Sequence, residues 1–152
     1  MNIRLLNDLR DFSNVDDFSN VGLGEEEIIA LENLYNSGQP FPTSLRELLY
    51  IAGSFCYLLE YGICKTQQEL QHRGITILND NELIMSRPYY VIDLGTDGFT
   101  YVYLDDDKND PTLFSVYTDN NYNEGHFYSS RQTLSKIILK RLENVKNGYT
   151  PF

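Results

Sequence analysis

Apolar and polar positions alternate most clearly between residues 89 and 118. The runs 89–94 and 99–104 are rich in aromatic and β-branched residues, and the second alternates with a period of two, which gives a strand two different faces. The stretch 95–98 between them carries two glycines, as tight connections do. A third run, 113–117, follows Pro111, and proline is tolerated where a strand begins. The pattern predicts an antiparallel meander of three strands.

Apolar residues recur at helical spacing in four other stretches. Helices are predicted over 2–12, over 25–35, from Ser44 to about Ala52, and from Ser129 or Ser130 to about Lys146. Three glutamates open the second helix, whose buried stripe is expected to include Leu34. The third is expected to begin with a capping box, in which the Ser44 side chain accepts a hydrogen bond from a backbone amide of the first turn and the Glu47 side chain accepts one from the backbone amide of Ser44. It is expected to end at Gly53.

The remaining stretches carry weaker signals. Residues 13–24 are polar and are interpreted as a connector, whereas 55–64 are apolar and fit either a strand or a helix. The stretch 66–72 predicts a turn or two of exposed helix stopped at Gly74, and 75–78 predicts a strand. Residues 127–128 are expected to add a short strand.

Length and composition indicate one globular domain spanning residues 1–152. The apolar content is 41%, which argues against disorder, and no run approaches the ~18 apolar residues of a membrane span. The first twelve residues are charged throughout and lack the apolar core of a secretion signal, so we expect a cytoplasmic protein that starts at Met1. Cys56 and Cys64 are interpreted as buried thiols.

The net charge of −10 is unevenly distributed. Residues 129–152 hold five basic side chains against Glu143, a net charge of +4, so the rest of the chain carries −14. Residues 93–124 hold eight acids against Lys108, a net charge of −7. An acidic field repels nucleic acid and attracts basic partners. The alternative interpretation is that the acids only keep a small protein soluble.

Metal sites and catalytic motifs are not expected. Asp105-x-Asp107-x-Asn109 begins like a calcium loop, but Asp110 and Val116 stand where that loop needs glycine and glutamate. Zinc requires about four ligands, and besides the two cysteines only His72 and His126 are available. No nucleophile elbow, phosphate loop or dinucleotide fingerprint is present. We therefore predict no metal, no cofactor and no enzyme.

Two blocks of the chain match a known pattern. The first, EEEIIALENLYNSGQPFPTSLRELLYIAGS, combines an acidic helix start, a proline break and a second helix that ends in Ala-Gly. The second, YYVIDLGTDGFTYVYLDDDKNDPTLFSVYT, is a strand, a turn, a strand, an acidic loop with Asp-Pro, and another strand. Together they resemble the SUKH superfamily, also called the Smi/Knr type. Ser54 replaces a second glycine and there is no tryptophan, so the chain resembles a divergent member.

The resemblance implies a fold and a function. The fold is α+β, with a central, mainly antiparallel sheet and helices packed against it. Bacterial members of this family are immunity proteins that bind and neutralise secreted polymorphic toxins, many of them nucleases. Eukaryotic relatives are regulatory adaptors without a toxin partner, which is the alternative function. The family has no agreed catalytic residues, so none is assigned.

The charge pattern and the resemblance lead to one hypothesis: an acidic surface binds a basic, nuclease-like toxin without catalysis. Tyrosines beside the acidic turn supply rigid anchors for such a surface. We expect a monomer or weak homodimer that binds a protein, and neither nucleic acid nor membrane. An enzyme acting on a cationic or acid-labile substrate is a third hypothesis, and it requires His126 to converge with carboxylates in a pocket. The expected partner-binding residues are Asp97, Tyr103, Asp105, Asp106, Asp107, Asp110, Asp119, Tyr122 and Glu124.

Overall fold

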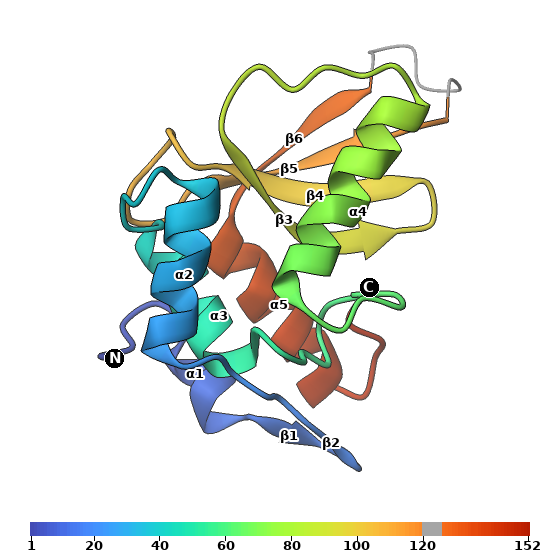
Figure 1. Cartoon of the computed structure of the whole chain (residues 1–152). Coiled ribbons are helices and arrows are strands. Elements are labelled where there is room, and N and C mark those ends of the chain that lie inside the picture. The colour runs from blue at the N-terminus through green and yellow to red at the C-terminus, as the bar shows by residue number, and fades with distance from the viewer. Residues whose placement is uncertain (120–125) are drawn as a thin grey trace.

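A four-stranded antiparallel sheet forms the centre of the computed structural model, which describes residues 1–119 and 126–152 (Figure 1). The strands pair in the order β3-β4-β5-β6, so the predicted meander is confirmed. Gly95 pairs with Gly98, which leaves Thr96 and Asp97 as a two-residue turn. A side chain at position 98 would not fit, because its Cβ would lie 1.8 Å from the Val116 carbonyl oxygen. The strands are β3 (Tyr89–Gly95), β4 (Gly98–Tyr103), β5 (Thr112–Tyr117) and β6 (Phe127–Thr133).

Helices cover both faces of the sheet, which gives three layers and the expected α+β fold class (Figure 1). Phe99 and Tyr101 of β4 pack on the face covered by α4 (Gln67–Asp80), together with Leu70 and Leu78. Val102 packs on the other face, in the larger core that contains α2 (Glu25–Tyr35), α3 (Thr43–Ala52) and α5 (Leu134–Lys146). The period of two in β4 therefore separates two cores. No helix in the described part of the chain is long and apolar enough to cross a membrane.

The predictions for α2 and α3 are confirmed in extent, and α3 ends at Gly53 as expected. Leu34 of α2 was expected to be buried but is exposed. The last helix ends at Lys146 as predicted, but it begins at Leu134 because β6 continues through Thr133. The predicted strand at 127–128 is thus longer, and the serines expected to cap the helix belong to it.

The predicted capping box at Ser44 and Glu47 is wrong. Helix α3 begins after Pro42, so Ser44 lies inside its first turn and is buried. The Glu47 carboxylate instead accepts from the backbone amides of residues 4, 5 and 6, at 2.8, 2.8 and 2.9 Å. These amides lead into α1 (Asn7–Asp11), which is shorter than the predicted helix over 2–12. A buried carboxylate therefore anchors the N-terminal segment on α3.

The stretch predicted as a turn of helix followed by a strand is one continuous helix, α4. Leu70, Gly74 and Leu78 recur four residues apart and face the sheet. Gly74 does not stop the helix, because it permits close packing: a Cβ there would lie 2.6 Å from Val91 Cγ2. Burial against the sheet therefore overrides the β propensity of residues 75–78.

The stretch interpreted as a connector, 13–24, holds a small hairpin of β1 (Asn14–Val15) and β2 (Phe18–Ser19). Val21 then forms an isolated antiparallel bridge with Phe55. Apart from this bridge, residues 55–64 contain neither helix nor regular strand, so neither alternative for that stretch is confirmed.

Side chains occupy both edges of the sheet. At the β3 edge, the amide of Gln71 accepts from Val91 N at 2.7 Å and donates to Val91 O at 2.9 Å, as a neighbouring strand would. At the β6 edge, Arg131 takes a positive φ of 58°, and the hydroxyls of Ser129 and Ser130 accept from the amides of residues 131 and 132. Both edges are therefore blunted against the addition of another strand.

Candidate functional site

The expected partner-binding residues lie at two opposite ends of the sheet. Tyr103 is the last residue of β4 and the acidic loop 105–110 follows it, whereas Asp97 occupies the turn before β4 and Asp119 follows β5. Strand β4 spans six residues, so the two groups lie roughly 17 Å apart. Tyr122 and Glu124 lie outside the described residues. The sheet therefore does not bring the acids into one continuous face.

At the first end, Asp105 is paired within the chain. Its Oδ1 accepts from Nη2 of Arg87 at 2.6 Å and from Nε at 3.0 Å, and these bonds lower the pKa of the Asp105 carboxyl below its usual value. The same guanidinium lies 3.9 Å above the centre of the Tyr103 ring. Tyr103 is half-buried against Tyr101, and the Tyr101 hydroxyl donates to the Tyr103 hydroxyl at 3.2 Å. Arg87 thus pairs its charge with Asp105 and stacks on the Tyr103 ring within the same chain.

The other carboxylates of the acidic loop fix its path. Asp107 Oδ1 accepts from the amides of residues 109 and 110, at 2.7 and 3.1 Å, which lowers its pKa. Asp106 Oδ2 accepts from Thr112 N at 3.3 Å. Asp110 accepts from both the amide and the hydroxyl of Ser135, at 3.0 and 2.6 Å. Because Thr133 makes no side-chain cap bond, Asp110 is the carboxylate that caps α5.

The backbone of the same loop also caps α3. The carbonyls of Lys108 and Asn109 accept from Thr43 N and Ser44 N, at 3.1 and 2.9 Å. The loop therefore joins the N-termini of two helices to the sheet. A role of its carboxylates in partner binding stays a prediction, and each of them has an intramolecular partner.

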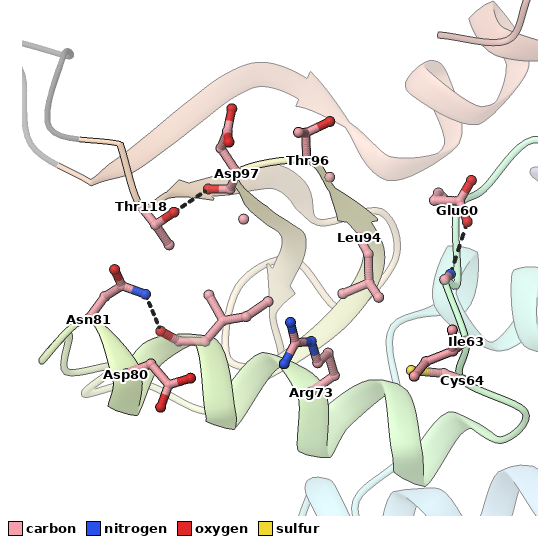
Figure 2. Close-up of a pocket in the computed structure, with 14 residues that line it drawn as sticks. Glu60, Ile63, Cys64, Arg73, Asp80, Asn81, Leu94, Thr96, Asp97 and Thr118 are labelled. Atoms are coloured by element: carbon pink, nitrogen blue, oxygen red, sulfur yellow. Dashed lines mark hydrogen bonds between the residues drawn. The ribbon is translucent and has the colours of Figure 1, made fainter.

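At the second end, a cleft of about 750 Å³ opens between α4, the β3–β4 turn and loop 60–64 (Figure 2). Its apolar walls are Leu94, Ile77 and Ile63, and the Ile63 side chain is 96% exposed. The side chains of Arg73 and Leu94 point toward each other across the opening (Figure 2). Charged groups at the cleft are Glu60, Arg73, Asp80 and Asp97.

Two of these carboxylates have no partner among residues 1–119 and 126–152. Neither Asp80 nor Asp97 has a side-chain hydrogen bond or ion pair within the residues that the structure describes. Asp97 uses only its backbone carbonyl, which accepts from the amide and the hydroxyl of Thr118 at 2.7 and 3.0 Å. The Glu60 carboxylate accepts from Gly62 N at 3.0 Å. Three acids against one arginine give this end a negative field.

A buried ion pair holds the loop that forms one wall of the cleft. Asp93 Oδ2 lies 2.6 Å from Arg141 Nη1, and Asp93 Oδ1 accepts from Glu60 N at 2.6 Å. Leu94 N donates in return to Glu60 O at 2.8 Å, and Arg141 donates to Leu58 O at 3.0 Å. Burial raises the pKa of the Asp93 carboxyl, and the adjacent guanidinium opposes that shift. Helix α5 and strand β3 together therefore fix loop 58–60.

Neither histidine of the chain is among the described residues that line the cleft. His126 lies outside its lining, and its Nδ1 donates to Tyr117 O at 2.7 Å. His72 is exposed on α4 and also lies outside the lining. Within residues 1–119 and 126–152 no three His, Cys, Asp or Glu side chains are grouped to hold a metal ion. Cys64 lines the cleft, and burial raises the pKa of its thiol, which lowers its thiolate fraction.

Sequence reasoning found Asp97 but missed Glu60, Arg73 and Asp80. Arg73 and Asp80 were missed because α4 was divided at Gly74, which hid the fact that both belong to one helix beside the turn. Glu60 was noted only as the single charge in an apolar stretch, and the irregular path of that loop carries no periodic signal.

Comparison with known proteins adds no relative: no family model, no curated protein and no solved structure matches this chain.

Proposed function

We propose that this protein binds a basic protein partner through the acidic cleft end of its sheet and neutralises it without catalysis. In the form that the SUKH resemblance suggests, the partner is a secreted toxin of the nuclease type, which is basic because nucleases bind phosphates. This protein is then the immunity protein that protects the producing cell.

The observation that carries the proposal is the pair of carboxylates, Asp80 and Asp97, that have no partner in the described part of the chain. A carboxylate already bonded within its own chain must share or give up those hydrogen bonds to meet a cation on a partner. An unpaired, exposed carboxylate is available to a cation on a partner, and several together accelerate the encounter. Both of these carboxylates line the same cleft, where Glu60 adds a third negative charge.

The shape of the same region fits recognition by side chains. Both edges of the sheet are blunted by side-chain hydrogen bonds, so strand addition is disfavoured. The cleft offers apolar walls beside its carboxylates, which suits a partner side chain with an apolar stem and a cationic end. Neutralisation of a nuclease requires only that its phosphate-binding surface be covered.

A capture experiment tests the proposal. Tagged protein is used as bait in an extract of the cells that make it, at low salt and at about 0.5 M salt, where exposed charge contacts are screened. We expect capture of a basic nuclease-like chain whose yield falls at high salt. Capture of a cytoplasmic regulator that is not basic would contradict the proposal and favour the adaptor function.

A further inference from the structure

A second cavity lies on the other side of the loop that borders the cleft. It has a volume of about 310 Å³, near the lower end of the ~300–1,000 Å³ typical of ligand pockets. Aromatic rings dominate its lining, and Phe18 at the hairpin stacks on Phe55 with a centroid distance of 6.2 Å. The aromatic residues that line this cavity are Phe18, Phe55, Tyr57, Tyr61 and Phe152.

The two cavities share one wall. Glu60, Gly62 and Cys64 line both of them, so loop 60–64 is a ridge with the acidic cleft on one side and the aromatic cavity on the other. Ile63 lies on this ridge and is 96% exposed. The ridge is held by the bonds between Glu60 and β3, and by Cys64 N donating to Tyr61 O at 3.1 Å. Its shape is therefore preorganised.

Three of the apolar side chains around the ridge do not contribute to either core. Ile63, Phe18 and Phe55 belong to neither hydrophobic cluster, and Phe18 is 59% exposed. Single exposed apolar residues need no explanation, but three beside two adjoining cavities form a patch typical of an interaction site. Aromatic pockets next to charged groups are where binding energy concentrates.

We infer that the ridge and its two flanking cavities form one docking surface for a protein segment that carries a bulky apolar residue and, several residues away, a lysine or arginine. The apolar residue enters the aromatic cavity and the segment packs over Ile63. Its cation meets Asp80 and Asp97, which lie at the far end of the cleft, beyond Arg73 (Figure 2). The sign of the partner's charge rests on the proposed function, whereas the aromatic anchor rests on the second cavity alone.

Peptide display on the full-length protein tests this inference. A phage library of random dodecapeptides is selected on the immobilised wild type, and enriched peptides are labelled and titrated against single variants. Ile63→Asp and Phe18→Ser alter the ridge and the aromatic cavity. The matched control is Ile84→Asp, because Ile84 is 84% exposed but lines neither cavity.

We expect enriched peptides with an aromatic or long aliphatic residue several positions from a cation. We also expect at least a tenfold loss of affinity for Ile63→Asp and Phe18→Ser but not for Ile84→Asp. Bound peptide should also slow alkylation of Cys64, which lines both cavities. No enrichment, or equal affinity for all three variants, would overturn the inference.

The same titrations separate the inference from the proposed function. Peptides that need Phe18 and Ile63 but carry no cation, and that bind Asp97→Asn as well as wild type, would support the anchor site and contradict a basic partner. Basic peptides that depend on Asp97 but not on Phe18 or Ile63 would support the proposed function and overturn the docking surface.

Discussion

The two ends of the central sheet both carry clusters of acids, but they use them differently. At the β4–β5 loop, Asp105 pairs with Arg87, Asp107 bonds its own loop, and Asp110 caps α5. At the cleft end, Asp80 of α4 and Asp97 of the β3–β4 turn have no side-chain partner among the described residues. Acidic side chains therefore stabilise the fold at one end of the sheet, whereas at the other end two of them remain available to bind a partner.

This difference shows why charge density alone is a poor guide to a binding surface. The loop with four aspartates has the highest density of acids in the sequence, yet its carboxylates and carbonyls satisfy the first turns of α3 and α5. At the cleft, Asp80 and Asp97 lie on separate elements, and among the described residues their carboxylates bond no other group. The two ends differ in whether their carboxylates accept hydrogen bonds from the chain itself.

The largest expected effect is at the cleft end, where one acid does serve the fold. Asp93→Ala leaves the buried Arg141 guanidinium without its carboxylate and frees Glu60 N, so we expect a loss of about 3–5 kcal/mol in the free energy of unfolding. Urea denaturation measures it. Adding Arg141→Leu should recover part of the loss, because no unpaired charge then remains. Equal stability of the two variants would contradict a buried pair.

The next largest effect tests whether the acidic loop stabilises the fold. Asp110→Ala removes the carboxylate that bonds Ser135 N and Oγ, and loss of such a cap costs about 1–2 kcal/mol. Asp110→Asn keeps an acceptor and should lose less. An unchanged urea midpoint for Asp110→Ala would show that the loop does not stabilise α5.

A third prediction uses alkaline pH, where the carboxylates of both ends are already ionised and do not contribute. Burial raises the pKa of the Cys56 thiol from 9.0 to about 12. Between these values the unfolded chain has released the proton and the folded chain has not, so stability falls as pH rises through this range. From this group alone we expect a loss of about 1.4 kcal/mol by pH 10.

Thermal or urea unfolding between pH 8 and 10 checks that prediction. Cys56→Ala is the control: it lowers stability at every pH because it leaves a cavity, but the decline with pH should be shallower than in the wild type. A decline as steep as that of the wild type would mean that Cys56 is not the group responsible.

The smallest stability effects are expected for exposed acids. Asp97→Asn should change the free energy of unfolding by no more than about 0.5 kcal/mol, because its carboxylate bonds nothing in the described part of the chain. Asp105→Asn should produce a small loss that disappears at high salt, because its pair with Arg87 is exposed. A loss at Asp97 comparable with that at Asp110 would remove the distinction between the two ends.

The sequence was sufficient for the elements with strong periodicity. The alternation in residues 99–104 and the stripe of Leu45, Leu48 and Leu49 report burial directly, and both elements formed where predicted. The helix α4 was not predictable in this way, because Gly74 and a β-branched run at 75–78 are unfavourable locally and are compensated only by packing on Val91.

The candidate site was predictable only in part. Asp97 was identified as one of the acids in the segment 93–124, but its neighbours Asp80 and Glu60 come from elements distant in sequence. The structural use of Glu47 and Asp110 depends on amides 41 and 25 residues away, and a local capping pattern cannot reveal them. The sequence alone could not predict which distant side chain accepts a hydrogen bond from a given backbone amide.

The most direct test of the account compares two double variants of equal net charge, each −8 instead of −10. Asp80→Asn with Asp97→Asn neutralises the cleft end, and Asp105→Asn with Asp106→Asn neutralises the loop end. The measurement is the yield of basic partner captured at low salt. We predict a loss of at least tenfold for the cleft-end variant and near wild-type capture for the loop-end variant. Equal losses, or a larger loss for the loop-end variant, would contradict the claim that the unpaired carboxylates at the cleft bind the partner.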